Sequence, residues 1–112
     1  MPFPQEIWGK LYENLVFLHL RRKSSVIYYF KRKYEVDFYV KIENKSQLIN
    51  VCVSLEDSQT KEREVRSLQE AMSALNLGEA TLLTADQEET ITTKEGVIQI
   101  LPVWKWICLN PD

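Results

Sequence analysis

Two strand-like runs joined by a short polar turn constrain this chain most strongly. Val36–Ile42 alternates apolar and polar residues, and Gln47–Ser54 does the same after the turn at Glu43–Ser46. Because successive side chains of a strand point to opposite faces, each run offers one apolar face to a core. A connection this short joins antiparallel neighbours. The chain is therefore expected to contain an antiparallel pair of strands here.

A helical pattern follows the pair and leads to another strand. Asp57 or Ser58 can cap this helix, and Gly78 is expected to end it in the left-handed conformation. The strand that follows is expected at Ala80–Ala85. A strand–helix–strand unit makes a right-handed crossover, so this strand should run parallel to the one before the helix. The apolar stripe of the helix consists of Val65, Leu68, Met72 and Leu75.

The remaining segments complete an α/β pattern. Residues 4–23 read as a helix, Val26–Phe30 as a strand, and Thr90–Thr93 with Gly96–Leu101 as a final hairpin. The tail at Val103–Cys108 is bulky and apolar, and it is expected to pack back onto the domain. The predicted order is α-βββ-α-β-ββ, a mixed sheet with helices packed on it, in one domain over residues 1–112.

Composition narrows the class of protein. The chain has 112 residues, of which 45% are hydrophobic, enough for a real core, and its net charge is only −2. Two cysteines give neither a disulfide framework nor a zinc motif. We find neither a secretory leader pattern nor a stretch of the roughly 20 apolar residues that a membrane helix needs. A cytoplasmic protein without a membrane partner is expected.

Six segments, in order along most of the chain, carry a resemblance to a known family. They are Gly9–Val16, Glu35–Phe38, Leu48–Cys52, Thr60–Glu64, Leu75–Gly78 and Pro102–Trp106. With the element order, they resemble the C-terminal domain of unknown function of prokaryotic AAA+-type ATPases, within the restriction-endonuclease-like fold of the PD-(D/E)xK nuclease superfamily. The resemblance implies either a domain excised from a longer chain, in which an ATPase module is its partner, or a stand-alone relative. The phosphate-binding loop of such a module is absent from these 112 residues.

The resemblance also implies a catalytic site in a depleted form. Asp37 matches the motif aspartate, and Glu13 matches an extra acid on the first helix of some members. Asn50 stands in the place of the second acid and Cys52 in the place of the lysine. Asn50 brings no charge, and Cys52 cannot supply the ammonium that stabilises the transition state. No cofactor is expected unless the site is active, in which case Glu13 and Asp37 would hold Mg²⁺ or Mn²⁺.

Each of these residues also has a purely structural interpretation. Asp37 can pair with a basic neighbour such as Lys33, and Glu13 with Lys10. Cys52 can be a small thiol packed in the sheet. His19, the single histidine, is expected to be a packed residue rather than a metal ligand.

Six basic residues form two clusters that could bind a nucleic-acid backbone. Because the strand at 26–30 separates the clusters by about 17 Å, they could equally lie apart. The clusters are Arg21, Arg22 and Lys23, and Lys31, Arg32 and Lys33.

Three functions follow. The first is a catalytically degenerate nuclease-like domain that binds protein or nucleic acid, with DNA as one candidate, beside an ATPase. The second is an active metal-dependent nuclease that uses Glu13 and Asp37. The third is a protein-interaction module in which Trp104 and Trp106 contact a partner.

Overall fold

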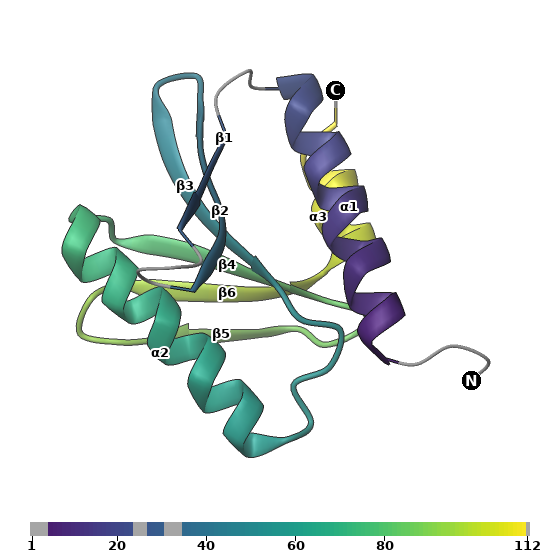
Figure 1. Cartoon of the computed structure of the whole chain (residues 1–112). Helices are drawn as coiled ribbons and strands as arrows, with labels where there is room; N and C mark the ends of the chain where they lie inside the picture. Colours follow the sequence, from purple (N-terminus) through teal and green to yellow (C-terminus); the bar gives the residue numbers. More distant parts are fainter. Residues whose placement is uncertain (1–4, 24–26, 31–34, 112) are drawn as a thin grey trace.

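A computed structural model describes residues 5–23, 27–30 and 35–111 of the chain (Figure 1). It confirms the predicted order of elements and adds a short helix where an apolar tail was expected. Most boundaries agree with the sequence prediction to within two residues. The elements are α1 (Gln5–Lys23), β1 (Ile27–Phe30), β2 (Val36–Ile42), β3 (Lys45–Val51), α2 (Ser58–Leu75), β4 (Glu79–Thr84), β5 (Glu89–Thr92), β6 (Val97–Pro102) and α3 (Val103–Leu109).

The strands form one mixed sheet in the order β1-β2-β3-β4-β6-β5. The pairs β1–β2 and β2–β3 are antiparallel, and β3–β4 is parallel, which confirms the predicted crossover through α2. The final hairpin is also confirmed, since β5 and β6 pair antiparallel. It is β6 that joins the body of the sheet, parallel to β4, and β5 forms the edge. The central strands β3 and β4 therefore have neighbours on both sides.

Helices cover both faces of the sheet, with α2 on one face and α1 and α3 together on the other (Figure 1). On the α1 side, Phe38 and Ile49 pack with Val16 in one apolar cluster. On the α2 side, Leu48 packs with Leu68 in a second cluster. The alternation of side chains along β3 thus sends Ile49 to one core and Leu48 to the other. Each core needs a helix to close it.

The β2–β3 connection is tighter than the polar tetrad that the sequence suggested. Glu43 (φ 52°) and Asn44 (φ 67°) both adopt left-handed backbone conformations, as in a two-residue hairpin turn of type I′. The third strand consequently begins at Lys45, two residues before the predicted start, and ends at Val51. Cys52 lies outside β3, although its N–H still donates to the Leu83 carbonyl at 2.8 Å. The chain therefore leaves the sheet near the residues of the predicted site.

The sequence prediction is correct at the N-terminal end of α2 and wrong at its C-terminal end. Asp57 is the N-cap, and its carboxylate accepts a hydrogen bond from the Gln59 N–H at 3.2 Å, as predicted. The prediction of Gly78 as the left-handed end was wrong, because Asn76 takes that conformation (φ 57°) and its N–H donates to Met72. Asparagine tolerates this conformation better than other side chains. Gly78 instead accepts the Val97 N–H at 2.9 Å.

The apolar tail packs back as expected, but as helix α3. Trp106 is buried, whereas the side chain of Trp104 is 63% exposed. His19 of α1 is packed against Trp106 with ring centroids 5.1 Å apart, and its Nε2 lies 2.6 Å from the Asn110 carbonyl oxygen. His19 is thus a packed residue between α1 and α3, as predicted. Along the described parts of the chain, no helix is both long and apolar enough to cross a membrane.

Candidate functional site

Asp37 on β2 and Asn50 on β3 meet across the hairpin, on the face covered by α2. The Asn50 side-chain carbonyl accepts a hydrogen bond from the Asp37 N–H at 2.9 Å. In return, the Asp37 carboxylate accepts a hydrogen bond from the Val51 N–H at 2.8 Å. Each side chain therefore bonds to the backbone of the opposite strand. The resemblance assigned these two positions to one site, and the structure brings them together.

A carboxylate from α2, which the sequence analysis did not single out, completes this cluster. The Asn50 amide nitrogen donates to the Glu64 carboxylate at 3.0 Å and also lies 3.4 Å from the Glu35 carbonyl oxygen. Asn50 is only 1% exposed, so its polar groups depend on these protein partners. We call Asp37, Asn50 and Glu64 the β2–β3–α2 polar cluster.

A signal for Glu64 was present in the sequence. The residue precedes Leu68 by four positions and therefore lies on the same side of the helix as a core residue. Its neighbours Lys61, Glu62, Arg63 and Arg66 are charged, so the segment as a whole resembles a solvent-exposed face. A carboxylate four residues from a buried leucine is a better indicator of a partly buried acid than the local density of charge.

The pKa values of Glu64 and of the neighbouring Cys52 are both raised. Burial raises the pKa of the Glu64 carboxyl, the nearby Asp37 carboxylate raises it further, and the hydrogen bond from Asn50 opposes the rise. Burial, followed by the Glu64 carboxylate, likewise raises the pKa of the Cys52 thiol. The thiol donates to the Ser54 carbonyl at 3.3 Å. A thiol held in its neutral form is a poor nucleophile, so Cys52 lacks the features of a reactive cysteine.

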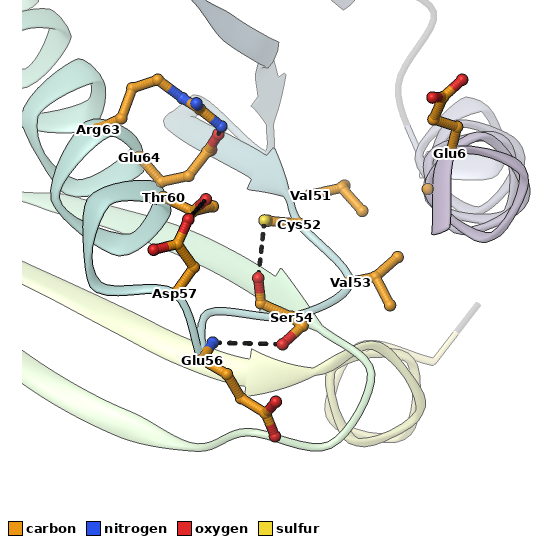
Figure 2. A pocket seen from close by; sticks show the side chains of 11 residues that line it. Glu6, Val51, Cys52, Val53, Ser54, Glu56, Asp57, Thr60, Arg63 and Glu64 are labelled. Atoms are coloured by element: carbon orange, nitrogen blue, oxygen red, sulfur yellow. Dashed lines mark hydrogen bonds and ion pairs between the residues drawn. The ribbon is translucent and has the colours of Figure 1, made fainter. Parts of the chain in front are cut away.

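An open pocket of about 590 Å³ lies beside the cluster, between α1 and α2, above the segment that follows β3 (Figure 2). Cys52 lines it from the segment that follows β3, Glu64 lines it from α2, and Glu6 of α1 lies on the other side. A guanidinium nitrogen of Arg63 lies 3.8 Å from a Glu64 oxygen, and the Arg63 side chain is 60% exposed. The remaining lining residues are Gly9, Val51, Val53, Ser54, Glu56, Asp57 and Thr60. Acids outnumber bases in this lining.

The predicted ligand Glu13 comes from the helix on the other face of the sheet. It is half-buried on α1, whose residues Glu6 and Gly9 reach the pocket. Over the residues that the structure describes, no three His, Cys, Asp or Glu side chains are arranged to hold a metal ion. Metal binding by Glu13 and Asp37 therefore stays a prediction, as does the catalytic assignment of Asn50 and Cys52.

The predicted nucleic-acid surface is only half within the described residues. Arg21 and Arg22 are exposed at the end of α1, and the Lys23 ammonium donates to the Pro111 carbonyl. Lys31, Arg32 and Lys33 lie outside the described residues. The convergence of the two basic clusters stays a prediction.

Comparisons with known proteins place this chain in a family. No solved structure matches the chain significantly. An uncharacterised protein of Methanocaldococcus jannaschii is 43% identical over 109 residues, which cover 88% of this chain and 24% of that relative. The chain thus spans about a quarter of the length of the curated relative that it matches. The model of the family described as a domain of unknown function, DUF4143, matches residues 8–106, and the chain therefore belongs to the DUF4143 family.

Proposed function

We propose that this chain is a catalytically degenerate, restriction-endonuclease-like domain that serves as an accessory module of an ATPase and binds nucleic acid or protein. The observation that carries the proposal is the use of Asn50. Its carbonyl oxygen accepts the Asp37 N–H, and its amide nitrogen donates to Glu64. At the position that matches the second acid, both polar groups of the side chain hold the fold together.

The chemistry of the cluster supports the loss of catalysis. Phosphodiester hydrolysis needs carboxylates that hold a metal ion and a cation that stabilises the developing charge. The Asp37 carboxylate already accepts the Val51 N–H, and a neutral thiol stands at Cys52. The described donors therefore fit a structural cluster better than a magnesium site, which requires near-octahedral oxygen ligands.

The architecture and the length of the relative support the rest of the proposal. A mixed sheet with α1 and α2 on opposite faces, in the order α-βββ-α-β, agrees with the resemblance to the nuclease superfamily. The M. jannaschii relative is about four times as long as the matched region, which leaves room for an ATPase module in the same polypeptide. Membership of a family described only as a domain of unknown function is compatible with a non-catalytic role.

A cleavage assay with matched variants tests this proposal. The protein is incubated with supercoiled, linear, branched and single-stranded DNA and with RNA, in Mg²⁺ and separately in Mn²⁺. We expect no cleavage, and calorimetric titration should show no metal site of sub-millimolar affinity. Metal-dependent cleavage that Asp37→Ala abolishes and Glu79→Ala, an exposed acid on β4, leaves intact would overturn the proposal.

One observation favours a second candidate, an active metal-dependent nuclease. Asp37 and Glu64 are close enough for the Asp37 charge to raise the pKa of Glu64, as happens where two carboxylates share a site. In that case Asp37 and Glu64 would be the metal ligands, with or without Glu13. Cleavage should then be lost in Asp37→Asn and in Glu64→Gln, and Glu13→Gln would report whether α1 contributes.

The exposed Trp104 keeps the third function, a pure protein-interaction module, open. Binding of a separately expressed ATPase module that Trp104→Ala weakens, without any nucleic-acid binding by the chain, would favour this function over the others.

A further inference from the structure

Strand β5 forms one edge of the sheet, so some of its backbone groups point away from β6 (Figure 1). The turn shows which groups these are, because Thr93 and Gly96 exchange two backbone hydrogen bonds at 2.7 and 3.2 Å. Bonded and non-bonded pairs alternate along an antiparallel ladder, so Ile91 also bonds to β6, whereas Thr90 and Thr92 do not. The N–H and C=O groups of Thr90 and Thr92 therefore point outward, and no described strand pairs with them.

Apart from its short length, the β5 edge lacks the features that usually prevent further pairing. Its sequence is Glu-Thr-Ile-Thr, with three β-branched residues and neither proline nor lysine. Its pairing with β6 is regular, whereas the strand at the opposite edge, β1, has a register shift between Tyr28 and Phe30. Irregularities of that kind disfavour the addition of another strand. Of the two edges, β5 is thus the one suited to accept a strand.

We propose that β5 of a second copy of this chain pairs with this edge, antiparallel and about a two-fold axis at Ile91. Such an interface requires a surface that is complementary to itself. In this register Thr90 of each copy lies opposite Thr92 of the other, and their outward groups form four hydrogen bonds. An axis at Thr90 or at Thr92 would instead pair the strand with residues beyond its ends. The axis at Ile91 is therefore the one that uses every outward group of β5.

The side chains of β5 fit the same register. Ile91 of one copy lies directly opposite Ile91 of the other, on the face of the sheet that α2 covers. Ile91 and Val65 of α2 are both partly buried at the margin of the apolar cluster on that face. Cross-strand pairs of β-branched residues stabilise a sheet, so the second copy extends this margin across the axis.

Two contacts fix the position of α2 relative to the axis. Lys61 bonds to Glu89 at 2.6 Å, and Gln69 bonds to Glu95 at 3.1 Å. The stretch of α2 from 61 to 69 therefore runs alongside the stretch of the hairpin from 89 to 95, in the same direction. Ile91 lies one third of the way along the hairpin stretch, so the axis is level with about residue 64 of α2.

Glu62 and Arg66 lie on either side of that level and match across the axis. Each is two residues, about 3 Å along the helix, from the level of the axis, so Glu62 of one copy stands opposite Arg66 of the other. Both side chains are exposed, and neither has an ionic partner within the described parts of the chain. Because the axis generates two identical pairs of opposite charge, the charges on α2 favour a second copy over an unrelated strand.

An open groove of about 470 Å³ lies on this flank of α2, where the second copy would approach. It is lined by Ser58, Lys61, Glu62, Val65, Arg66 and Gln69. The interface is smaller than the roughly 800 Å² per partner of a standard one, since it contains one pair of short strands and two charge pairs. We therefore expect a reversible dimer with a dissociation constant of about 10–100 µM.

Sedimentation equilibrium of the whole chain, from about 5 to 500 µM, covers the range where mass action reveals such a dimer. Thr92→Pro should weaken the dimer at least tenfold, because it removes an outward N–H while the ladder with β6 uses no N–H of Thr92. The matched control is Thr92→Val, which changes the side chain, keeps the backbone N–H and should leave the dimer unaffected. Circular dichroism checks that both variants fold.

Charge exchange on α2 tests the position of the axis. Glu62→Arg should weaken the dimer about threefold or more, and the double variant Glu62→Arg/Arg66→Glu should restore most of the loss. The control is Glu70→Arg, the same change at an exposed acid of α2 about 9 Å from the level of the axis, and it should have the smaller effect.

Amide hydrogen exchange tests the register without any substitution. The N–H groups of Thr90 and Thr92 should exchange about threefold more slowly at 500 µM than at 20 µM, because only the dimer protects them. The N–H groups of Ile91 and Thr93 bond to β6 and should exchange equally at both concentrations. A chain that is monomeric at 500 µM, or a dimer in which Thr90 and Thr92 gain no protection, would overturn the proposal. A dimer that Thr92→Val weakens as much as Thr92→Pro would overturn it as well.

Discussion

Substitution of Asn50 by aspartate tests whether the β2–β3–α2 polar cluster serves the fold. The change keeps an oxygen for the Asp37 N–H but removes the donor to Glu64, which is 3.0 Å away. A hydrogen bond to a charged group contributes about 1.5–3 kcal/mol, and the variant also sets a buried carboxylate against Glu64 and Asp37. We expect Asn50→Asp to lower the free energy of unfolding at pH 7 by about 3 kcal/mol.

The loss of stability in Asn50→Asp should increase as pH rises. Burial and the two neighbouring carboxylates raise the pKa of the carboxyl introduced at position 50 in the folded state. The folded variant therefore retains a proton that the unfolded chain releases, so the variant loses stability as pH rises above about 4. When protonated, the new carboxyl can still donate to Glu64. The difference from the natural protein should thus be small near pH 4 and full near pH 7.

Urea denaturation followed by tryptophan fluorescence measures both effects. A loss of about 3 kcal/mol is a large part of the roughly 6–17 kcal/mol expected for a domain of this size, and it should lower Tm by about 10–20 °C. The control is Asn44→Asp, which adds the same charge at an exposed turn residue and should change stability by less than about 0.5 kcal/mol. Equal stability of Asn50→Asp and the natural protein at pH 7, or a loss that is the same at pH 4 and pH 7, would refute the reasoning.

Two further predictions concern α2 and the last hairpin. Glu64→Gln keeps an oxygen for the Asn50 amide and removes the charge that Asp37 opposes, so it should raise the free energy of unfolding at pH 7 by roughly 1 kcal/mol or less. It should also abolish the decline of stability that Glu64 causes as pH rises above about 4.3. Urea titrations from pH 4 to 8 measure both effects, and lower stability of the variant at pH 7 would contradict the prediction. Gly96→Ala should cost at least about 2 kcal/mol, because Gly96 has φ +149° and a Cβ there would lie 2.0 Å from the Gly78 carbonyl oxygen. The control is Gly78→Ala, where a Cβ meets nothing within 4 Å and which should cost less than about 1 kcal/mol. Thermal melts measure both variants, and similar losses of stability would contradict the steric explanation for Gly96.

The sequence located most elements because their signals are local. β2 was predicted at its observed bounds from alternation alone, and α2 was found from its apolar stripe and its cap at Asp57. The left-handed end of α2 was misplaced by two residues, since Asn76 and Gly78 both tolerate the conformation and the Met72 carbonyl is offered to Asn76. The conformational preferences of asparagine and glycine allow either position, and the hydrogen bond from the Asn76 N–H to the Met72 carbonyl determines which of them ends the helix.

The candidate site also has members that the sequence indicated and one that depends on tertiary packing. The resemblance to the nuclease pattern assigned Asp37 and Asn50 to one site, and the register that makes them neighbours was set by the tight turn at Glu43 and Asn44. The third member, Glu64, lies fourteen residues from Asn50 on a helix, and its contact depends on how α2 is rotated against the sheet. That rotation follows from the packing of Leu68 and Met72 in the core. It is a property of the folded domain, because no local preference sets it.

By itself, the sequence determined the periodicity of each segment, the parallel pairing of β3 and β4, and the neutral residues at positions 50 and 52. These follow from backbone geometry and from residue identity. Only the tertiary structure decided that β6 lies between β4 and β5, that Asn50 bonds to Glu64, and that α1 keeps apolar side chains exposed on its outer face. Those three outcomes depend on which surfaces are buried against each other, and that is determined by how the whole chain packs.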